Sequence, residues 1–178
     1  MFLQKWDVAF LMGIPRGPWG DLIMPILTYL GEYGGIWIVL TILLLCWKKT
    51  RLIGCTMAIA LLFAWITGEY ILKLLIARPR PFYSLPELTL LVPPPGSFSF
   101  PSGHTASSFA AAFAIFFWRK RIGIVALIIA ALIAFSRLYL YVHYPSDVLG
   151  GLLLGLFSAI GAFWLIKKWR TKKERPTL

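Results

Sequence analysis

The sequence predicts an all-α fold, an integral membrane bundle of about five transmembrane helices with an interfacial helix at its N-terminus. Of its 178 residues, 59% are hydrophobic and only 14% are charged. The apolar residues form long runs that approach the roughly 20 residues a helix needs to cross a bilayer. Short basic clusters separate these runs, which is typical of multi-span proteins. A soluble domain of this composition would expose large apolar patches, so that class is excluded.

The first segment, residues 1–19, holds a short helix-compatible stretch before a run of glycines and prolines breaks the pattern. That stretch is too short to span a bilayer. An interfacial helix fits it better, with Trp6 and Trp19 at the level of the lipid headgroups. Asp7 and the lack of a small-residue cleavage site argue against a signal peptide.

Five apolar segments follow the interfacial helix, and three glycines interrupt the first of them. The expected spans cover residues 21–47, 52–76, 103–118, 122–139 and 147–166. A proline-rich loop over residues 77–101 and a short connection over 140–146 join the later spans. We expect one membrane-embedded domain over residues 1–178, whose basic cytoplasmic tail, 167–178, is frayed.

The net charge of +11 is concentrated at one side of the predicted membrane topology. Twelve of the eighteen lysines and arginines fall in three clusters at span ends: Lys48, Lys49 and Arg51; Arg119, Lys120 and Arg121; and Lys167, Lys168, Arg170, Lys172, Lys173 and Arg175. Such clusters mark the cytoplasmic side and can touch anionic lipid. A nucleic-acid surface is not expected, because no soluble face is available to carry one.

The opposite, outer side gathers ionisable residues at the ends of several spans. These are Lys73, Arg78, Arg80 and Arg137, both histidines of the chain, His104 and His143, and Asp147. Ionisable groups at membrane depth are costly, and a cluster of them indicates a functional site. The alternative is that the lysine and arginine side chains only extend to the lipid headgroups and form no functional site.

This residue set suits a bound anion, and phosphate is the natural candidate. Arginine binds phosphate oxygens in a bidentate manner and lysine adds a point charge. In the stretch PSGH, Ser102 or a neighbour can cap the following helix, and its N-terminal N–H groups then favour an anion. Gly103 allows phosphate to approach the backbone closely.

The second histidine lies just before the last span, because Pro145 is favoured in the first turn of a helix. Asp147 in that turn can accept from one ring nitrogen of His143 and leave the other nucleophilic. The alternative is a His–Asp pair that only caps the helix. His104, His143 and Asp147 could also hold zinc, but four nearby cations would repel a dication, so no metal or other cofactor is expected.

Three motifs in order resemble the signature of the type 2 phosphatidic acid phosphatase superfamily, which includes vanadium haloperoxidases. They are K-x6-R-P from Lys73 to Pro81, P-S-G-H from Pro101 to His104, and S-R-x5-H-x3-D from Ser136 to Asp147. No signature position departs from the pattern, and the flanking apolar segments are similar to the membrane-embedded branch of the family.

The resemblance implies a role for each matched position. His143 would attack phosphorus and form a phosphohistidine, with Asp147 orienting it, while His104 would serve as general acid and then as general base. The phosphate oxygens would be held by Lys73, Arg80 and Arg137, together with Ser102 and the amide of Gly103. The family needs no metal.

Two further residues lie outside the signature. Glu69 is one turn before Lys73 and can orient it through an i,i+4 pair, or it can simply face a polar crevice. Arg78 could contact a substrate headgroup or a lipid phosphate, and the lipid phosphate is the favoured expectation.

The predicted function is a metal-independent lipid phosphatase at the outer face of a bacterial cytoplasmic membrane. The resemblance suggests undecaprenyl pyrophosphate, phosphatidylglycerophosphate, phosphatidic acid or lipid A as substrates. A lipid-to-lipid phosphotransferase could use the same motifs, and a non-catalytic transporter or scaffold is a more distant alternative. The bilayer and a lipid phosphate are the expected partners, nucleic acid is not, and the sequence predicts no oligomeric state.

Overall fold

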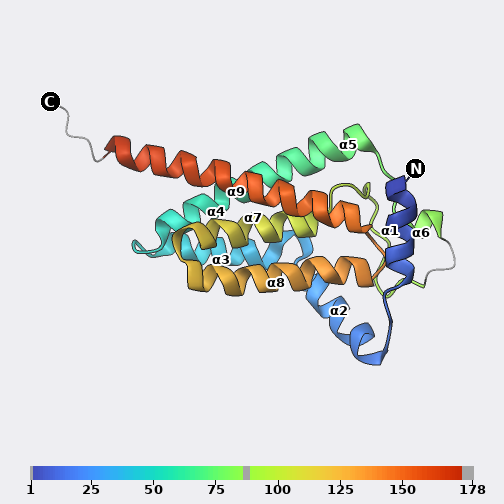
Figure 1. Ribbon diagram of the computed structural model, residues 1–178. Coiled ribbons are helices and arrows are strands. Elements are labelled where there is room, and N and C mark those ends of the chain that lie inside the picture. Colours follow the sequence, from blue (N-terminus) through green and yellow to red (C-terminus); the bar gives the residue numbers. More distant parts are fainter. Residues whose placement is uncertain (1, 86–88, 174–178) are drawn as a thin grey trace.

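The computed structural model describes residues 2–85 and 89–173, and every regular element within these ranges is helical. The helices are α1 (Phe2–Met12), α2 (Pro18–Leu30), the 3₁₀ turn η1 (Glu32–Gly34), α3 (Gly35–Cys46), α4 (Arg51–Trp65), the π-helix η2 (Ile66–Leu72), α5 (Lys73–Ile76), α6 (Pro81–Ser84), α7 (Gly103–Trp118), α8 (Lys120–Tyr139) and α9 (Pro145–Lys173). The long helices run side by side in an elongated bundle (Figure 1). The predicted all-α membrane fold is confirmed.

Helix α7 is the centre of the bundle and packs against α4, α8 and α9. Its inner positions are mostly alanine, including the fully buried Ala110 and Ala114. Opposite them on α9, an added Cβ at Gly151 would meet Ser102 O at 2.6 Å, and one at Gly155 would meet Ala106 O at 2.7 Å. Small residues therefore let the two backbones touch, as in other membrane helix pairs. This contact brings the start of α7 beside the start of α9.

Three stretches of the described chain are long and apolar enough to cross a membrane: Arg51–Ser84, Lys120–Tyr139 and Pro145–Lys172. The pair α2 and α3 would make a fourth span, although the two helices are bent by 42°. Helix α7 has 16 residues, so it is about 24 Å long, and neighbouring helices cover it. The described chain thus has three candidate spans, or four with the bent pair, and α7 coincides with the remaining predicted segment, 103–118.

The bend in the first span occurs where the sequence has its three glycines. Tyr33 (φ 50°) and Gly34 (φ 71°) both adopt left-handed backbone conformations there. An added Cβ at Gly31 would meet Ile133 Cγ2 at 2.7 Å and His104 Cδ2 at 3.2 Å. The break therefore lets the chain turn closely over the start of α7, which a straight helix would not.

The described parts of the three basic clusters, at 48–51, 119–121 and 167–173, lie at one end of the bundle (Figure 1). The expectation of a frayed tail from residue 167 is wrong for residues 167–173, because α9 continues as helix through them. The remaining part of that tail, 174–178, lies outside the described residues.

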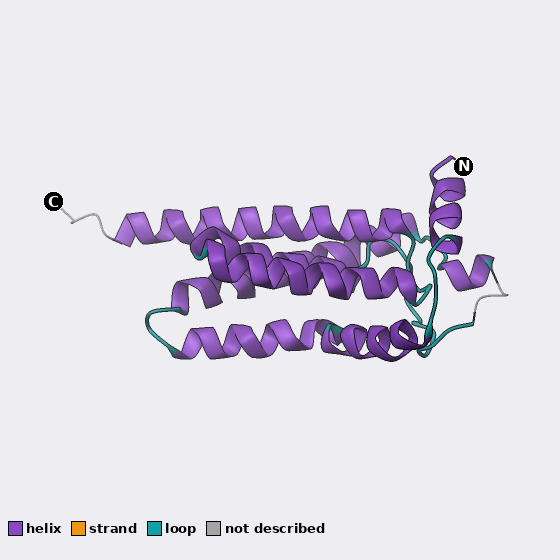
Figure 2. Ribbon diagram, turned by 60° about the horizontal axis from the view of Figure 1, so that its bottom comes forward, coloured by secondary structure: helices purple, strands orange, loops and turns teal. Residues whose placement is uncertain are grey.

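Helix α1 stands across the other end of the bundle in both views (Figure 1, Figure 2). It exposes Trp6 and Phe10, and Trp19 just after it is 77% exposed. Asp7 on the same helix is fully buried. An amphipathic helix with this placement matches the predicted interfacial helix.

Candidate active site

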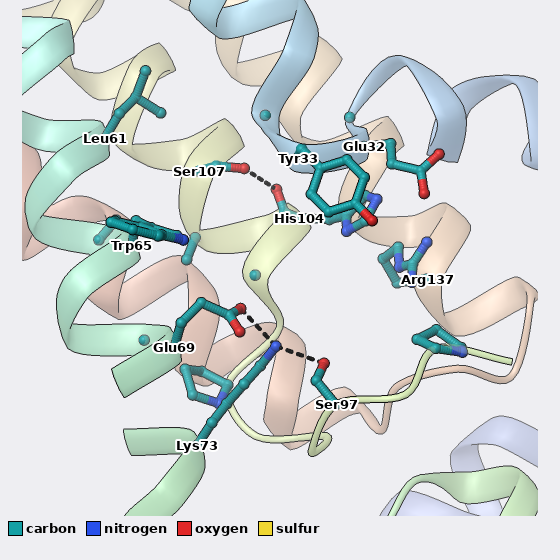
Figure 3. A pocket seen from close by; sticks show the side chains of 18 of the residues that line it. Glu32, Tyr33, Leu61, Trp65, Glu69, Lys73, Ser97, His104, Ser107 and Arg137 are labelled. Carbon is teal, nitrogen blue, oxygen red and sulfur yellow. Dashed lines mark hydrogen bonds and ion pairs between the residues drawn. The ribbon is translucent and has the colours of Figure 1, made fainter. Parts of the chain in front are cut away.

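A cavity of about 1300 Å³ opens at the end of the bundle next to α1. Its lining includes most of the residues that the sequence singled out: Glu69, Lys73, Arg80, Gly103, His104, Arg137 and His143. Apolar side chains from α3 and α4 also line it, and two of them, Ile42 and Leu62, are exposed on the bundle surface. Figure 3 shows the charged side chains converging on this space from several helices. The structure thus brings together residues that are up to 74 positions apart in the sequence, from Glu69 to His143.

The stretch PSGH forms the start of α7, as predicted. Ser102 is the N-cap residue, and its Oγ accepts from Thr105 N at 3.4 Å and from Thr105 Oγ1 at 2.9 Å. Ser102 is fully buried and is not among the described residues that line the cavity. Its hydroxyl caps the helix in this structure, and the predicted contact of Ser102 with phosphate stays a prediction. Gly103 and His104, the next two residues, do face the cavity.

His143 lies in the turn between α8 and α9 and is 2% exposed. Its Nε2 is 3.0 Å from Arg80 Nη1, and its Nδ1 has no hydrogen-bond partner among the described residues. Burial lowers the pKa of His143 well below its ordinary value, and the nearby charges of Arg80, Arg137 and Lys73 lower it further. The imidazole is therefore neutral at physiological pH, the form in which a ring nitrogen is nucleophilic.

Asp147 is fully buried one helical turn after His143. Its Oδ2 is 3.6 Å from His143 Nδ1, which is an ion-pair distance and too long for the predicted hydrogen bond. Closer donors use the carboxylate: Ser99 Oγ at 2.5 Å and Tyr144 N at 2.8 Å on Oδ2, and Arg78 Nη1 at 2.7 Å on Oδ1. The carboxylate is thus held rigidly beside the imidazole by three other groups.

Lys73 is the first of three buried cations around the cavity. Its Nζ donates to Glu69 Oε1 at 2.6 Å and to Ser97 Oγ at 3.0 Å (Figure 3). Glu69 belongs to the π-helix η2, and an i,i+4 pair with Lys73 is what the sequence suggested for it. The same Oε1 would lie 3.1 Å from a Cβ added at Gly103, so Glu69 also reaches the start of α7.

Arg80 and Arg137 are the other two buried cations. Arg80 donates to Ser97 O at 2.7 Å and to Val142 O at 2.8 Å, which fixes its guanidinium beside His143. Arg137 Nη1 donates to Thr28 Oγ1, while its Nε has no partner among the described residues. Because buried donors are almost always satisfied, an unpaired donor on a cavity-lining arginine favours an anionic ligand.

The contacts of Arg78 differ from those expected from the sequence. It was expected to contact a lipid phosphate, but it donates to Asp147, Ser146 and Asp7 instead. Its guanidinium also lies 4.0 Å from the centre of the Tyr144 ring. With these internal partners, Arg78 is a structural part of the site.

The sequence analysis did not identify Ser97, Ser99 and Asp7, which hold side chains of the site in place. Ser97 and Ser99 lie in the proline-rich loop, where no periodicity indicates which side chains face inward. Asp7 had one available signal, since it is the lone carboxylate in an apolar stretch.

Glu32 completes the polar rim of the cavity. Figure 3 shows it near Arg137, at the break between α2 and α3.

Within residues 2–85 and 89–173, no group of three or more histidine, cysteine, aspartate or glutamate side chains is placed to hold a metal ion. The cavity therefore combines three buried cations with two histidines, an arrangement suited to a phosphoryl group.

Comparisons with known proteins agree with this geometry. An undecaprenyl-diphosphatase of Sulfolobus acidocaldarius is 38% identical over 133 residues, which cover 73% of this chain and 64% of that protein. The bacitracin transport permease protein BcrC of Bacillus licheniformis is 35% identical over 152 residues, covering 83% and 74%. The chain therefore spans less than two thirds of the length of the Sulfolobus relative.

Two crystal structures share the fold. Aquifex aeolicus LpxE has a TM-score of 0.78 and 28% identity, over 90% of this chain and 94% of that one. A transmembrane PAP2-type phosphatidylglycerolphosphate phosphatase from Bacillus subtilis has a TM-score of 0.73 and 30% identity, covering 98% and 89%. The model of the PAP2 superfamily matches residues 51–171, which include every motif residue of the cavity. This chain belongs to the PAP2 superfamily.

Proposed function

We propose that this protein is a lipid phosphatase that hydrolyses a phosphate monoester or a pyrophosphate of a membrane lipid, through a phosphohistidine and without a metal ion. One observation carries the proposal: a buried, neutral histidine lies between a fixed carboxylate and three cations that line the same cavity. Relatives named as phosphatases of undecaprenyl diphosphate, phosphatidylglycerophosphate and lipid A support the same reaction class.

In the first step, Nε2 of His143 attacks the terminal phosphorus, and its bond to the leaving oxygen breaks, which is the lipid oxygen in a monoester and the bridging oxygen in a pyrophosphate. Asp147 stabilises the positive charge that forms on the ring, across the 3.6 Å to Nδ1. Arg80 already touches Nε2, so its guanidinium is in place to bind the oxygens of a phosphoryl group transferred there.

His104 is the proposed proton donor for the leaving lipid oxygen. It lines the cavity from the first turn of α7, on a different helix from the nucleophile. In the second step it takes a proton from water, which attacks the phosphohistidine and releases inorganic phosphate. Lys73, Arg137 and the backbone at Gly103 are the proposed remaining ligands of the phosphoryl oxygens, and Glu69 is proposed to orient Lys73.

We propose further that residues 1–178 act as one phosphatase domain, with the active site at the outer face of a bacterial cytoplasmic membrane. The described parts of the basic clusters lie at the opposite end of the bundle, and such clusters favour the cytoplasm. The apolar lining from α3 and α4 gives a lipid chain a path along the bilayer. Undecaprenyl diphosphate is the first substrate to test, because several relatives carry its name.

The test is a substrate panel on the purified protein in detergent with a chelator present. We expect phosphate release from at least one of undecaprenyl diphosphate, phosphatidylglycerophosphate, phosphatidic acid and lipid A, inhibition by vanadate, and no activity in His143→Ala. Full activity of His143→Ala would contradict the assignment of the nucleophile. A newly phosphorylated lipid without free phosphate, seen by mass spectrometry, would identify a phosphotransferase instead.

A further inference from the structure

Arg78 joins two buried carboxylates that come from opposite ends of the chain. Its Nη1 donates to Asp147 Oδ1 at 2.7 Å and to Ser146 Oγ at 2.6 Å, and its Nη2 donates to Asp7 Oδ2 at 2.7 Å. The two arms of the planar guanidinium thus serve different partners. A side chain held in this way has one orientation, because moving toward one carboxylate loses the other.

Asp7 is the less expected of the two carboxylates, since it comes from the interfacial helix α1. It is fully buried. Besides Arg78, it accepts from Ser146 N at 2.9 Å and from Ser146 Oγ at 2.6 Å. Ser146 is the second residue of α9 and directly precedes Asp147. A carboxylate at this place satisfies a backbone donor in the first turn of α9.

The two contacts together hold Asp147 from two directions. Arg78 fixes its side chain directly, and Asp7 fixes the backbone one residue before it. The interaction of Asp147 with His143 spans 3.6 Å with no hydrogen bond, so the distance depends on the other partners of the carboxylate. Ser99 and Tyr144 N hold only Oδ2, which leaves Arg78 as the partner of Oδ1.

We propose that Asp7 and Arg78 are positioning residues for the phosphoryl transfer, and that docking of α1 onto the end of the bundle is required for full activity. This role rests on the proposed function. Asp7 holds Arg78, Arg78 holds Asp147, and Asp147 faces the imidazole of His143. Neither Asp7 nor Arg78 is among the described residues that line the cavity. Their removal displaces the carboxylate that stabilises the charged imidazole, and such misplacement lowers the rate of the chemical step more than it weakens binding.

The decisive variant is Asp7→Asn, which keeps the size of the side chain and removes its charge. Its matched control is Asp21→Asn, because Asp21 also lies in the N-terminal region and also binds an arginine, Arg16, at 3.4 Å. Among the described residues, Asp21 makes no hydrogen bond to the Arg78 network and accepts instead from Tyr139 OH at 2.7 Å. We expect Asp7→Asn to lower kcat about tenfold or more with KM within about twofold of the wild type, while Asp21→Asn leaves both unchanged.

A second pair of variants gives an independent readout. Arg78→Lys keeps a cation near Asp147 but loses the planar guanidinium whose two arms bind different carboxylates. Arg78→Gln loses the charge as well. We expect kcat to fall in the order wild type, Arg78→Lys, Arg78→Gln, and vanadate inhibition to weaken in parallel, since vanadate occupies the phosphoryl position. Thermal unfolding in detergent identifies the variants that fold, and if Asp7→Asn does not fold, the Arg78 pair decides.

The outcomes separate this role from the proposed function. If the wild type releases no phosphate from any lipid of the panel, the proposed function fails. If the wild type is active and folded Asp7→Asn matches it in kcat, the positioning role of Asp7 is overturned while the phosphatase stands. Equal kcat for Arg78→Lys and Arg78→Gln, or an effect on KM alone, would also overturn it.

Discussion

Both ends of the bundle are rich in lysine and arginine, but their cations have different surroundings. At the end formed by the three basic clusters, the described lysines and arginines are exposed to solvent. At the cavity end, Lys73 is 6% exposed, Arg80 3% and Arg137 4%. Exposed cations cost little and serve topology, whereas buried cations are retained only with partners or for a task.

The difference shows that position and partners, and not residue type, separate a topology signal from a site. Among the described residues, only Lys73 of the three buried cations has an ion pair, with Glu69, because Asp147 pairs with the partly exposed Arg78. The surplus positive charge faces the cavity, next to a neutral histidine. A phosphoryl group would balance that surplus, and the following changes test whether it does.

The largest expected difference between the two ends comes from removing one arginine at each. Arg137→Ala should lower kcat/KM about a hundredfold to a thousandfold, because it removes a donor for the phosphoryl oxygens. Arg121→Ala, in the exposed cluster, should leave kcat/KM unchanged. Phosphate release by the two variants in parallel measures this, and equal activities would remove the functional distinction between the ends.

Stability should respond in the opposite sense at the cavity end. Among the described residues, Arg137 donates only to Thr28, and its buried Nε has no partner. Replacing such a buried charge is often neutral or stabilising. We therefore expect the Tm of folded Arg137→Ala in detergent to be at or above that of the wild type, and a large decrease would show that Arg137 is needed for the fold.

A smaller effect is expected when a cavity cation keeps its charge but loses its partner. Glu69→Gln removes the 2.6 Å ion pair of Lys73 and leaves the lysine in place. We expect kcat/KM to fall about tenfold, because Lys73 is no longer held in one orientation. Steady-state kinetics on the lipid that the wild type prefers will measure this. An unchanged kcat/KM would mean that Glu69 only borders a polar crevice.

The smallest expected effect is a shift in pH dependence. Burial and the surrounding cations lower the pKa of His143, so the neutral nucleophile persists below the ordinary value of about 6.5. The acid limb of kcat/KM that belongs to His143 should therefore lie below about pH 6.5. In Arg137→Ala it should move toward higher pH, because one of the charges that lower the pKa is gone.

The same shift has a consequence for stability. As pH falls below about 6.5, the unfolded chain binds a proton at this histidine and the native protein does not, so the free energy of unfolding decreases. Two kinetic results would contradict the assigned electrostatics. One is an acid limb of the wild-type kcat/KM at or above about pH 6.5, and the other is an acid limb that does not shift in Arg137→Ala.

The sequence predicted the parts of this arrangement that depend on local patterns. Apolar runs give the spans, PSGH begins α7, and Pro145 begins α9 two residues after His143. The glycines at 31, 34 and 35 indicated an interruption in the first span, although not its angle of 42°. These features follow from backbone preferences within a few residues.

The parts that the sequence did not predict depend on contacts between distant segments. Arg78 binds Asp7, 71 residues away, and Ser99 binds Asp147, 48 residues away. No periodicity indicates such pairs. The missing hydrogen bond between His143 and Asp147 has the same origin, because the competing donors come from elsewhere in the fold.

The central claim is that His143 carries the phosphoryl group, and trapping that intermediate tests it most directly. The purified protein should be mixed with its lipid substrate, quenched at alkaline pH, where phosphohistidine survives, and digested for mass spectrometry. We expect phosphate on the peptide that contains His143, and none in His143→Gln. Phosphate on another residue, or phosphorylation of His143→Gln at the wild-type level, would contradict the account.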